Sequence, residues 1–229
     1  MTALRIDVWS DIACPWCYVG KRRLESALAK FPHEVELVFR SFELDPAAPR
    51  LREGTQVDLL ATKYRLPRGQ AQQMVDRMVA TGAAEGIEFR YDAIRGGNTF
   101  DAHRLLHLAR AAGVQVAMKE RLMRGYFCEG VAIGDANALV PLAVEVGLAE
   151  ADVRATLDSD RYADDVRRDE QLAQEIGVTG VPFFVMAGRI AISGAQASEI
   201  LRTALERALV EVRTRRATDD ASACGPDGC

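Results

Sequence analysis

The spacing of hydrophobic residues changes along the chain and divides it into three parts. Near the start, residues 4–10 and 35–42 alternate apolar with polar side chains, which predicts two β-strands. Between them, apolar residues from 18 to 28 recur at helical spacing, which predicts a helix. A strand, a helix and a strand in this order predict a parallel pair of strands joined by a right-handed crossover.

The middle of the chain has a helical pattern almost throughout. From about residue 56 to residue 168, amphipathic segments are separated by Gly and Pro residues that mark turns. The expected helices comprise residues 57–64, 68–85, 98–112, 114–128, 137–146 and 150–157. This block predicts an all-helical insertion between the first βαβ unit and a later pair of strands.

The end of the chain returns to strands followed by a helix. The pattern predicts a helix over 162–176, an apolar stretch at 178–186, a strand at 190–193 and a helix from 196 to about 213. A βαβ start and a ββα end predict an α/β protein with a thioredoxin-like fold. The expected parts are a core of residues 1–55 plus 170–213, a helical insertion of residues 56–169 and a polar, mobile tail of residues 214–229.

The composition narrows the possible partners and the compartment. The 229 residues carry a net charge of −4, which gives no electrostatic reason to expect nucleic acid. No apolar run approaches the ~20 residues of a membrane span, and the N-terminus has no apolar region typical of a signal peptide. We therefore expect a cytoplasmic protein, as a monomer or homodimer, that contacts neither nucleic acid nor membrane.

Two cysteines stand at the junction of the first strand and the first helix. The residues Cys14-Pro15-Trp16-Cys17 predict a redox dithiol, because Cys14 would sit at the helix N-terminus. Free backbone N–H groups and the helix dipole stabilise an anion there, so we expect a Cys14 pKa below that of a free thiol. Cys17, one turn further on, could then close the disulfide, and Pro15 suits the first helical turn.

The same spacing has other interpretations. A C-x-x-C pair is also half of a structural zinc site, or it can be two buried core thiols. The chain has no second C-x-x-C and only three histidines, so zinc would need ligands from scattered places. We expect redox chemistry without a metal or an organic cofactor, and a buried or half-buried free thiol at Cys128.

Four motifs in register carry a resemblance to a known family. They are residues 10–20 around the dithiol, residues 98–104, residues 180–184 and residues 193–196. The chain resembles the DsbA-like thioredoxin-fold family, and within it the FrnE branch of dithiol–disulfide oxidoreductases and isomerases. The resemblance implies dithiol chemistry at Cys14 and Cys17, and a cis-proline loop at Val181-Pro182 facing them. An ordinary trans proline at a strand start is the alternative.

Two further residues are candidate neighbours of the dithiol. Trp16 either contacts substrate or packs beside the site, and exposure of its ring would favour substrate contact. His103 either makes a local hydrogen bond or carries a proton at the active site, and the resemblance keeps it near the dithiol. We expect His33 and His107 on the surface or on a helix face.

A second pair of cysteines, Cys224 and Cys229, lies at the C-terminus. The Pro-Asp-Gly between them favours a turn that could bring the two sulfur atoms together. One interpretation is a second redox pair that exchanges electrons with the first dithiol. The other is an incidental tail that oxidises or binds metal easily.

The sequence therefore predicts a thiol–disulfide oxidoreductase or isomerase that acts on protein thiols or on glutathione. Relatives of this fold also resemble glutathione-dependent isomerases such as 2-hydroxychromene-2-carboxylate isomerase, in which a serine usually replaces the first cysteine. Having both Cys14 and Cys17 counts against that alternative. A thiol-based redox sensor or metal-binding chaperone is the third interpretation.

Overall fold

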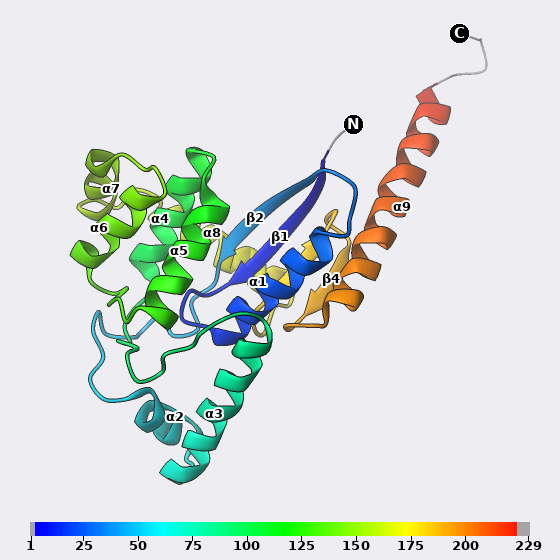
Figure 1. Ribbon diagram of the computed structural model, residues 1–229. Helices are drawn as coiled ribbons and strands as arrows, with labels where there is room; N and C mark the ends of the chain where they lie inside the picture. The colour runs from blue at the N-terminus through cyan, green and yellow to red at the C-terminus, as the bar shows by residue number, and fades with distance from the viewer. Residues whose placement is uncertain (1–2, 224–229) are drawn as a thin grey trace.

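A four-stranded mixed sheet forms the centre of the computed structural model, which describes residues 3–223, with side chains described to residue 214 (Figure 1). The strands are β1 (Leu4–Ser10), β2 (Val35–Ser41), β3 (Phe183–Met186) and β4 (Ile190–Ser193). Their order is β2-β1-β3-β4, with β1 parallel to β2 and antiparallel to β3. β1 and β2 pair in register from Leu4 opposite Val35 to Ser10 opposite Ser41.

Helices α1 (Pro15–Leu28) and α9 (Ser198–Ala223) cover one face of this sheet (Figure 1). The alternation of β1 directs Ile6 and Val8 to this face, where both are buried. They pack there with Leu24 of α1 and with Leu201 and Leu205 of α9.

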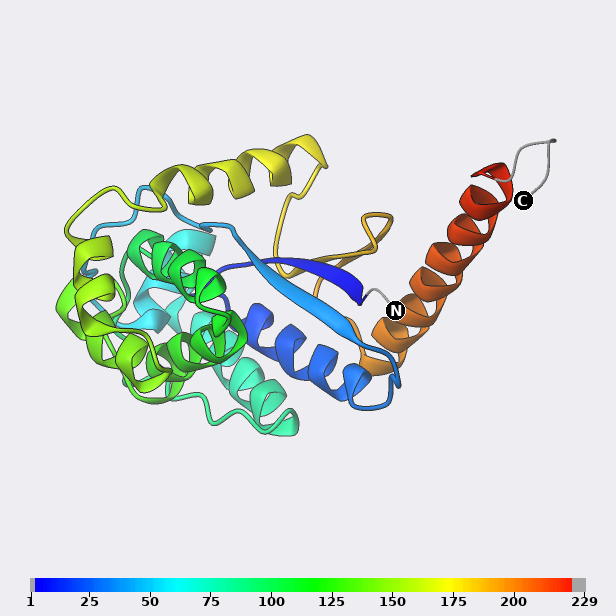
Figure 2. The same cartoon turned by 90° about the horizontal axis from the view of Figure 1, so that it is seen from above.

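The other face carries α8 (Ala163–Glu175), which packs against β2 (Figure 2). Trp9 of β1 points to this side and donates its indole N–H to the Asp169 carbonyl at 2.9 Å. The Asp169 carboxylate accepts from the Ser41 backbone N–H at 3.0 Å and from Arg40 at 2.7 Å. α8 therefore packs on the sheet. The boundary expected between the insertion and the core, at residue 169, falls inside this helix.

The remaining helices form the insertion beside the sheet (Figure 2). They are α2 (Gln56–Tyr64), α3 (Arg68–Ala84), α4 (Phe100–Ala111), α5 (Gln115–Cys128), α6 (Ala136–Glu145) and α7 (Glu150–Leu157). Their apolar core includes Leu105, Met118 and Leu122, and Cys14 and Cys17 pack into this same core. The predicted thioredoxin-like fold with an all-helical insertion is confirmed, and the insertion closes over the dithiol.

The C-terminal helix is longer than the pattern predicts. Residues 214–223 were expected to be part of a mobile tail, but α9 continues to Ala223. The helix end expected near residue 213 is therefore ten residues too early, because residues 214–223 contain neither Gly nor Pro and an established helix adds residues at little cost. Cys224 and Cys229 lie outside the described residues.

No helix in the described range, residues 3–223, is long and apolar enough to cross a membrane.

Candidate active site

Cys14 is the residue that precedes the first turn of α1. Its backbone is extended, with φ −94° and ψ 112°, and Pro15 begins the helix where no backbone N–H is needed. The Cys14 carbonyl accepts the backbone N–H of Cys17 at 3.0 Å. Both cysteines are free thiols, with only 4% of Cys14 and 2% of Cys17 exposed. The junction therefore places Cys14 at the positive end of α1 and Cys17 behind it.

The loop before β3 reaches the first thiol. The peptide bond between Val181 and Pro182 is cis, as the resemblance implies, and the Cys14 Sγ lies 3.6 Å from the Val181 carbonyl oxygen as its hydrogen-bond donor. On α1, Gly20 faces Pro182 so closely that an added Cβ would lie 2.8 Å from the Pro182 Cγ. A residue without a side chain at position 20 therefore allows the loop to lie against α1.

Asp11 supports the turn that leads into the dithiol. Its carboxylate accepts the Ala13 N–H at 3.3 Å and the Leu44 N–H at 2.8 Å, and the Nε2 of His103 lies 3.4 Å from Oδ1. Burial alone would raise the pKa of Asp11. The interaction with His103, the Leu44 N–H and the charge of Lys119 outweigh burial and hold this pKa below its usual value. His103 is fully buried beside Asp11, and its role in catalysis stays a prediction.

Lys119 of α5 is a site residue that the sequence analysis missed. It is fully buried, and its Nζ donates to the Ser10 carbonyl at 3.3 Å, next to Asp11. Burial lowers the pKa of Lys119 to about 8, against the opposing influence of Cys17, Asp11 and Cys14. Helical spacing did contain a signal, because the apolar residues Leu122 and Met123 follow three and four positions later on the same face.

Burial also acts on the second thiol. It raises the pKa of Cys17 well above its usual value, and the neighbouring Cys14 raises it further. The charge of Lys119 opposes both effects. Cys17 therefore holds its proton at neutral pH and needs a base before it can act as a nucleophile.

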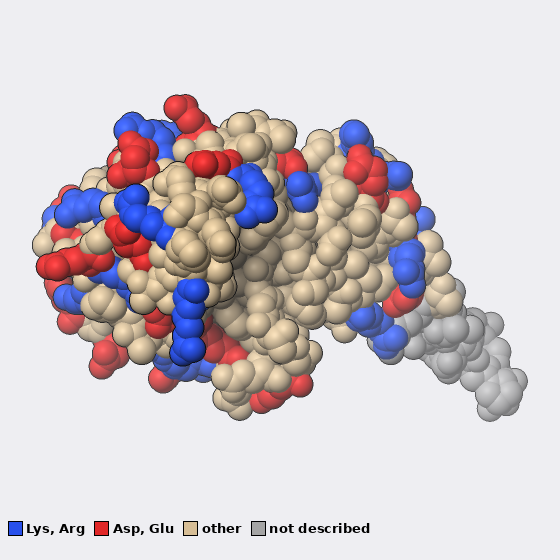
Figure 3. All heavy atoms as spheres, turned by 90° about the horizontal axis from the view of Figure 1, so that it is seen from below, with Lys and Arg blue, Asp and Glu red and all other residues tan. Residues whose placement is uncertain are grey.

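The surface of the molecule includes an exposed aromatic residue beside the dithiol and an uncharged hollow. Trp16 is 47% exposed although its neighbours Cys14 and Cys17 are buried. Seen from below, the molecule has an uncharged hollow between the insertion and the sheet domain, with charged side chains around it (Figure 3). An exposed aromatic ring next to a nucleophile is suited to contact a substrate chain.

The structure corrects the expectation for His107. This residue was expected on a surface or helix face, but only 8% of it is exposed, and its Nε2 lies 3.1 Å from the Ser41 Oγ and 3.3 Å from Asp169. α4 contacts α5, α7 and α8, so it has no free face over most of its length.

Cys128 is a half-buried free thiol, as expected.

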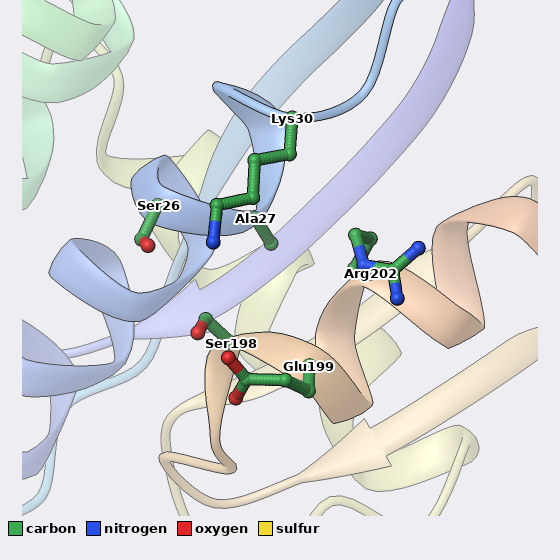
Figure 4. Close-up of a pocket in the computed structure, with 6 residues that line it drawn as sticks. All are labelled: Ser26, Ala27, Lys30, Ser198, Glu199 and Arg202. Carbon is green, nitrogen blue, oxygen red and sulfur yellow. The ribbon is translucent and has the colours of Figure 1, made fainter.

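A polar pocket lies between α1 and α9, away from the dithiol (Figure 4). Its lining includes the two cations Lys30 and Arg202 and the single carboxylate of Glu199. The lining residues come from the last turn of α1 and the loop after it, and from the first turns of α9. Among the residues that the structure describes, no group of three His, Cys, Asp or Glu side chains could hold a metal ion.

A dithiol at a helix N-terminus, faced by a cis-proline loop of a mixed sheet, defines a thioredoxin-fold dithiol protein. A family model for the DSBA-like thioredoxin domain matches residues 5–206. The chain therefore belongs to the DSBA-like family of thiol–disulfide oxidoreductases.

Solved structures agree with this assignment. The probable DsbA oxidoreductase SCO1869 from Streptomyces coelicolor is 44% identical, with a TM-score of 0.86 over 99% of this chain and 98% of that one. The cytosolic disulfide reductase DsbM from Pseudomonas aeruginosa is 16% identical, with a TM-score of 0.61 over 93% and 99%. A 2-hydroxychromene-2-carboxylate isomerase is 15% identical, with a TM-score of 0.63 over 93% of this chain and 98% of that one. At such low identity, the likenesses to DsbM and to this isomerase show the fold alone.

Proposed function

We propose that this protein exchanges disulfides with thiol substrates through Cys14 and Cys17. The Cys14 thiolate attacks one sulfur of a substrate disulfide, and the other substrate sulfur leaves as a thiolate. Cys17 then attacks the Cys14 sulfur of the mixed disulfide and releases the second substrate sulfur. Two electrons pass from the dithiol to the substrate, and the reverse sequence oxidises a substrate dithiol.

The position of Cys14 is the observation that carries this proposal. Its sulfur lies at the N-terminus of α1 and 3.6 Å from the Val181 carbonyl, while Cys17 lies one turn behind it. The helix end stabilises a thiolate, and the neighbouring Cys17 can resolve a bond formed at Cys14. The roles of attacking and resolving sulfur follow from this difference in position.

The substrates that we propose are protein disulfides and small thiols such as glutathione. Exposure of Trp16 supports contact with a substrate chain beside Cys14. DsbM, which shares the fold, is a cytosolic disulfide reductase and has also been solved with glutathione. These points support a cytoplasmic enzyme that uses glutathione as a co-substrate. We further propose that it is a monomer or homodimer and that it needs no metal or organic cofactor.

Glutathione-driven reduction of insulin tests the proposal. We expect turnover in the wild type and in Cys128→Ser, because Cys128 is half-buried and outside the dithiol. We expect the loss of turnover in Cys14→Ser. Equal turnover by wild type and Cys14→Ser would contradict the proposed function.

Glutathione-dependent isomerisation is the alternative, which the structural likeness to the 2-hydroxychromene-2-carboxylate isomerase supports. In that case, the protein would bind glutathione and isomerise an aromatic substrate without a change in the Cys14–Cys17 redox state. Isothermal titration with glutathione, together with a thiol count before and after turnover, distinguishes the two.

A further inference from the structure

Lys119 is a buried amine that the helical insertion, rather than the sheet domain, supplies to the dithiol. It lies on α5 with no exposed surface, and its Nζ donates to the Ser10 carbonyl at 3.3 Å. The same nitrogen lies 5.7 Å from the centroid of the Phe39 ring on β2. A charged amine is costly to bury, so a buried lysine beside reactive thiols needs a physical explanation.

The next residue on α5 holds this helix against the dithiol helix. Glu120 accepts the Tyr18 hydroxyl at 2.7 Å and the Lys21 ammonium at 2.6 Å, and Tyr18 directly follows Cys17 in the chain. Met118 and Leu122 pack in the same apolar core as both cysteines. The neighbours of Lys119 on α5 therefore contact α1 or pack in the core that contains both cysteines, which holds Lys119 in this part of the molecule.

The groups around Lys119 and its burial together bring its pKa close to neutral pH. Asp11, Cys14 and Cys17 favour its charged form, whereas Lys21 and burial favour its neutral form. Burial is the largest of these effects and brings the pKa to about 8. Both the ammonium and the free amine are therefore present near neutral pH.

Cys17 needs such a base because burial holds its proton. Asp11 is the other candidate, but its low pKa makes it a weak base. Its two oxygens already accept the Ala13 and Leu44 N–H groups, and its His103 neighbour has no hydrogen-bond contact with either thiol among the described residues. The amine of Lys119 is the stronger base.

We propose that Lys119 accepts the proton that Cys17 releases when Cys17 resolves the mixed disulfide. This proposal rests on the proposed function. The neutral amine takes the thiol proton and becomes an ammonium, the Cys17 sulfur bonds to the Cys14 sulfur, and the substrate sulfur leaves as a thiolate that solvent protonates. In the reverse direction, the ammonium returns the proton to Cys17.

Formation of the mixed disulfide prepares Lys119 for this step. A Cys14 thiolate favours the charged form of Lys119, and this negative charge disappears when Cys14 bonds to a substrate sulfur. The pKa of Lys119 then falls, because one of the influences that raise it is gone. The amine becomes a base in the state in which Cys17 must lose its proton.

Two variants separate proton transfer from the effect of a buried charge. Lys119→Met removes the charge and the base at similar length, whereas Lys119→Arg keeps a cation that does not deprotonate in proteins. Reduced protein is mixed rapidly with glutathione disulfide from pH 6 to pH 10, and the formation and the resolution of the mixed disulfide are followed by acid quench and mass spectrometry.

The proposal predicts that both variants form the mixed disulfide but resolve it about 100-fold more slowly at pH 7.5. The wild-type resolution rate should rise with an inflection below pH 8, because the Lys119 pKa falls once Cys14 is bonded to the substrate, and both variants should lose this inflection. Wild-type resolution by Lys119→Arg would overturn the proposal. Failure of the wild type to form any mixed disulfide would instead contradict the proposed function.

A titration keeps the proposal falsifiable if these variants do not fold. The chain has four lysines, Lys21, Lys30, Lys63 and Lys119, so their side-chain nitrogens can be followed separately by NMR. We compare Cys17→Ser with a free Cys14 and Cys17→Ser with Cys14 blocked as a methyl disulfide. The pKa of Lys119 should be lower in the blocked form, and an ammonium that persists to pH 10 there would overturn the proposal.

Discussion

Gly20 on α1 and Pro182 before β3 are in such close contact that a methyl group on Gly20 would lie 2.8 Å from the Pro182 Cγ. Through this contact the helix that begins at Cys14 and the loop that contains Val181 have a fixed relative position. Gly194 contributes by donating its N–H to the Pro182 carbonyl at 2.8 Å. The distance between Cys14 and Val181 therefore depends on a glycine that carries no chemistry itself.

Substitution of Gly20 tests this dependence. In Gly20→Ala, the new methyl group must displace the loop, so we expect slower disulfide exchange and a loss of about 1–3 kcal/mol in the free energy of unfolding. Gly69→Ala is the matched control, because Gly69 is also helical and an added Cβ there meets nothing within 4 Å. Urea unfolding and insulin reduction should change little in the control, and equal behaviour of the two variants would contradict the account.

Acid should weaken the packing of α8 on the sheet through Asp169. Burial alone would raise the pKa of Asp169, but His107, the Ser41 N–H and Arg40 outweigh it and hold this pKa below its usual value. A carboxylate with a lowered pKa stabilises the fold above its unfolded pKa of about 4, and this contribution is lost as the pH falls through the folded pKa.

Asp169→Asn should therefore cost about 1–3 kcal/mol at pH 7 and less at pH 3, measured by urea unfolding. Asp164→Asn on the same helix is the control, since Asp164 is exposed, and its effect should stay within about 0.5 kcal/mol. A cost of Asp169→Asn that is the same at pH 7 and pH 3 would be evidence against the ionised carboxylate as its source.

The exposed ring of Trp16 should bind protein substrates. In Trp16→Ala, we expect KM for a disulfide-bonded protein to rise roughly fivefold, which corresponds to about 1 kcal/mol of lost binding. The rate with glutathione disulfide should change less, because this small substrate contacts less surface. An equal change for both substrates would point to an effect on the Cys14 thiol itself, to be checked by its alkylation rate.

The direction of α9 bears on the tail cysteines. α9 begins beside Ser26 and Lys30 and continues for 26 residues, about 39 Å, away from the body of the molecule (Figure 1). The six residues after Ala223 extend at most about 20 Å. Exchange between Cys224 or Cys229 and the dithiol of the same chain would therefore require α9 to unfold.

We predict that a Cys224→Ser, Cys229→Ser double variant keeps its glutathione-driven turnover when the protein is dilute. An exchange between two chains predicts a turnover number that rises with enzyme concentration in the wild type and not in the double variant. A loss of turnover in the double variant at every concentration would instead show exchange within one chain.

The site residues that the sequence analysis identified are those whose signal comes from nearby positions in the chain. Cys14 and Cys17 lie three positions apart after a strand, and Pro182 follows Val181 in a motif that the family resemblance identifies. The ends of most helices also followed from Gly and Pro residues and from apolar spacing. Such signals depend on neighbours in the chain, which a single sequence contains.

The residues that were missed depend on contacts between distant segments. Lys119 and His107 carry charged or polar groups on helices that are covered on several sides, and single-helix spacing does not show what covers them. The contact between Gly20 and Pro182 joins positions that lie far apart in the sequence. α9 exceeded its expected end because the loss of apolar spacing after residue 213 does not by itself end a helix.

Trapping of a substrate on Cys14 tests the central claim most directly. Cys17→Ser, incubated with a disulfide-bonded protein and analysed by peptide mass spectrometry, should accumulate a mixed disulfide at Cys14, because the resolving thiol is absent. Cys14→Ser should accumulate none at Cys17, which is buried and holds its proton. A mixed disulfide that forms at Cys17 or Cys128 instead, or none in either variant, would contradict Cys14 as the attacking sulfur.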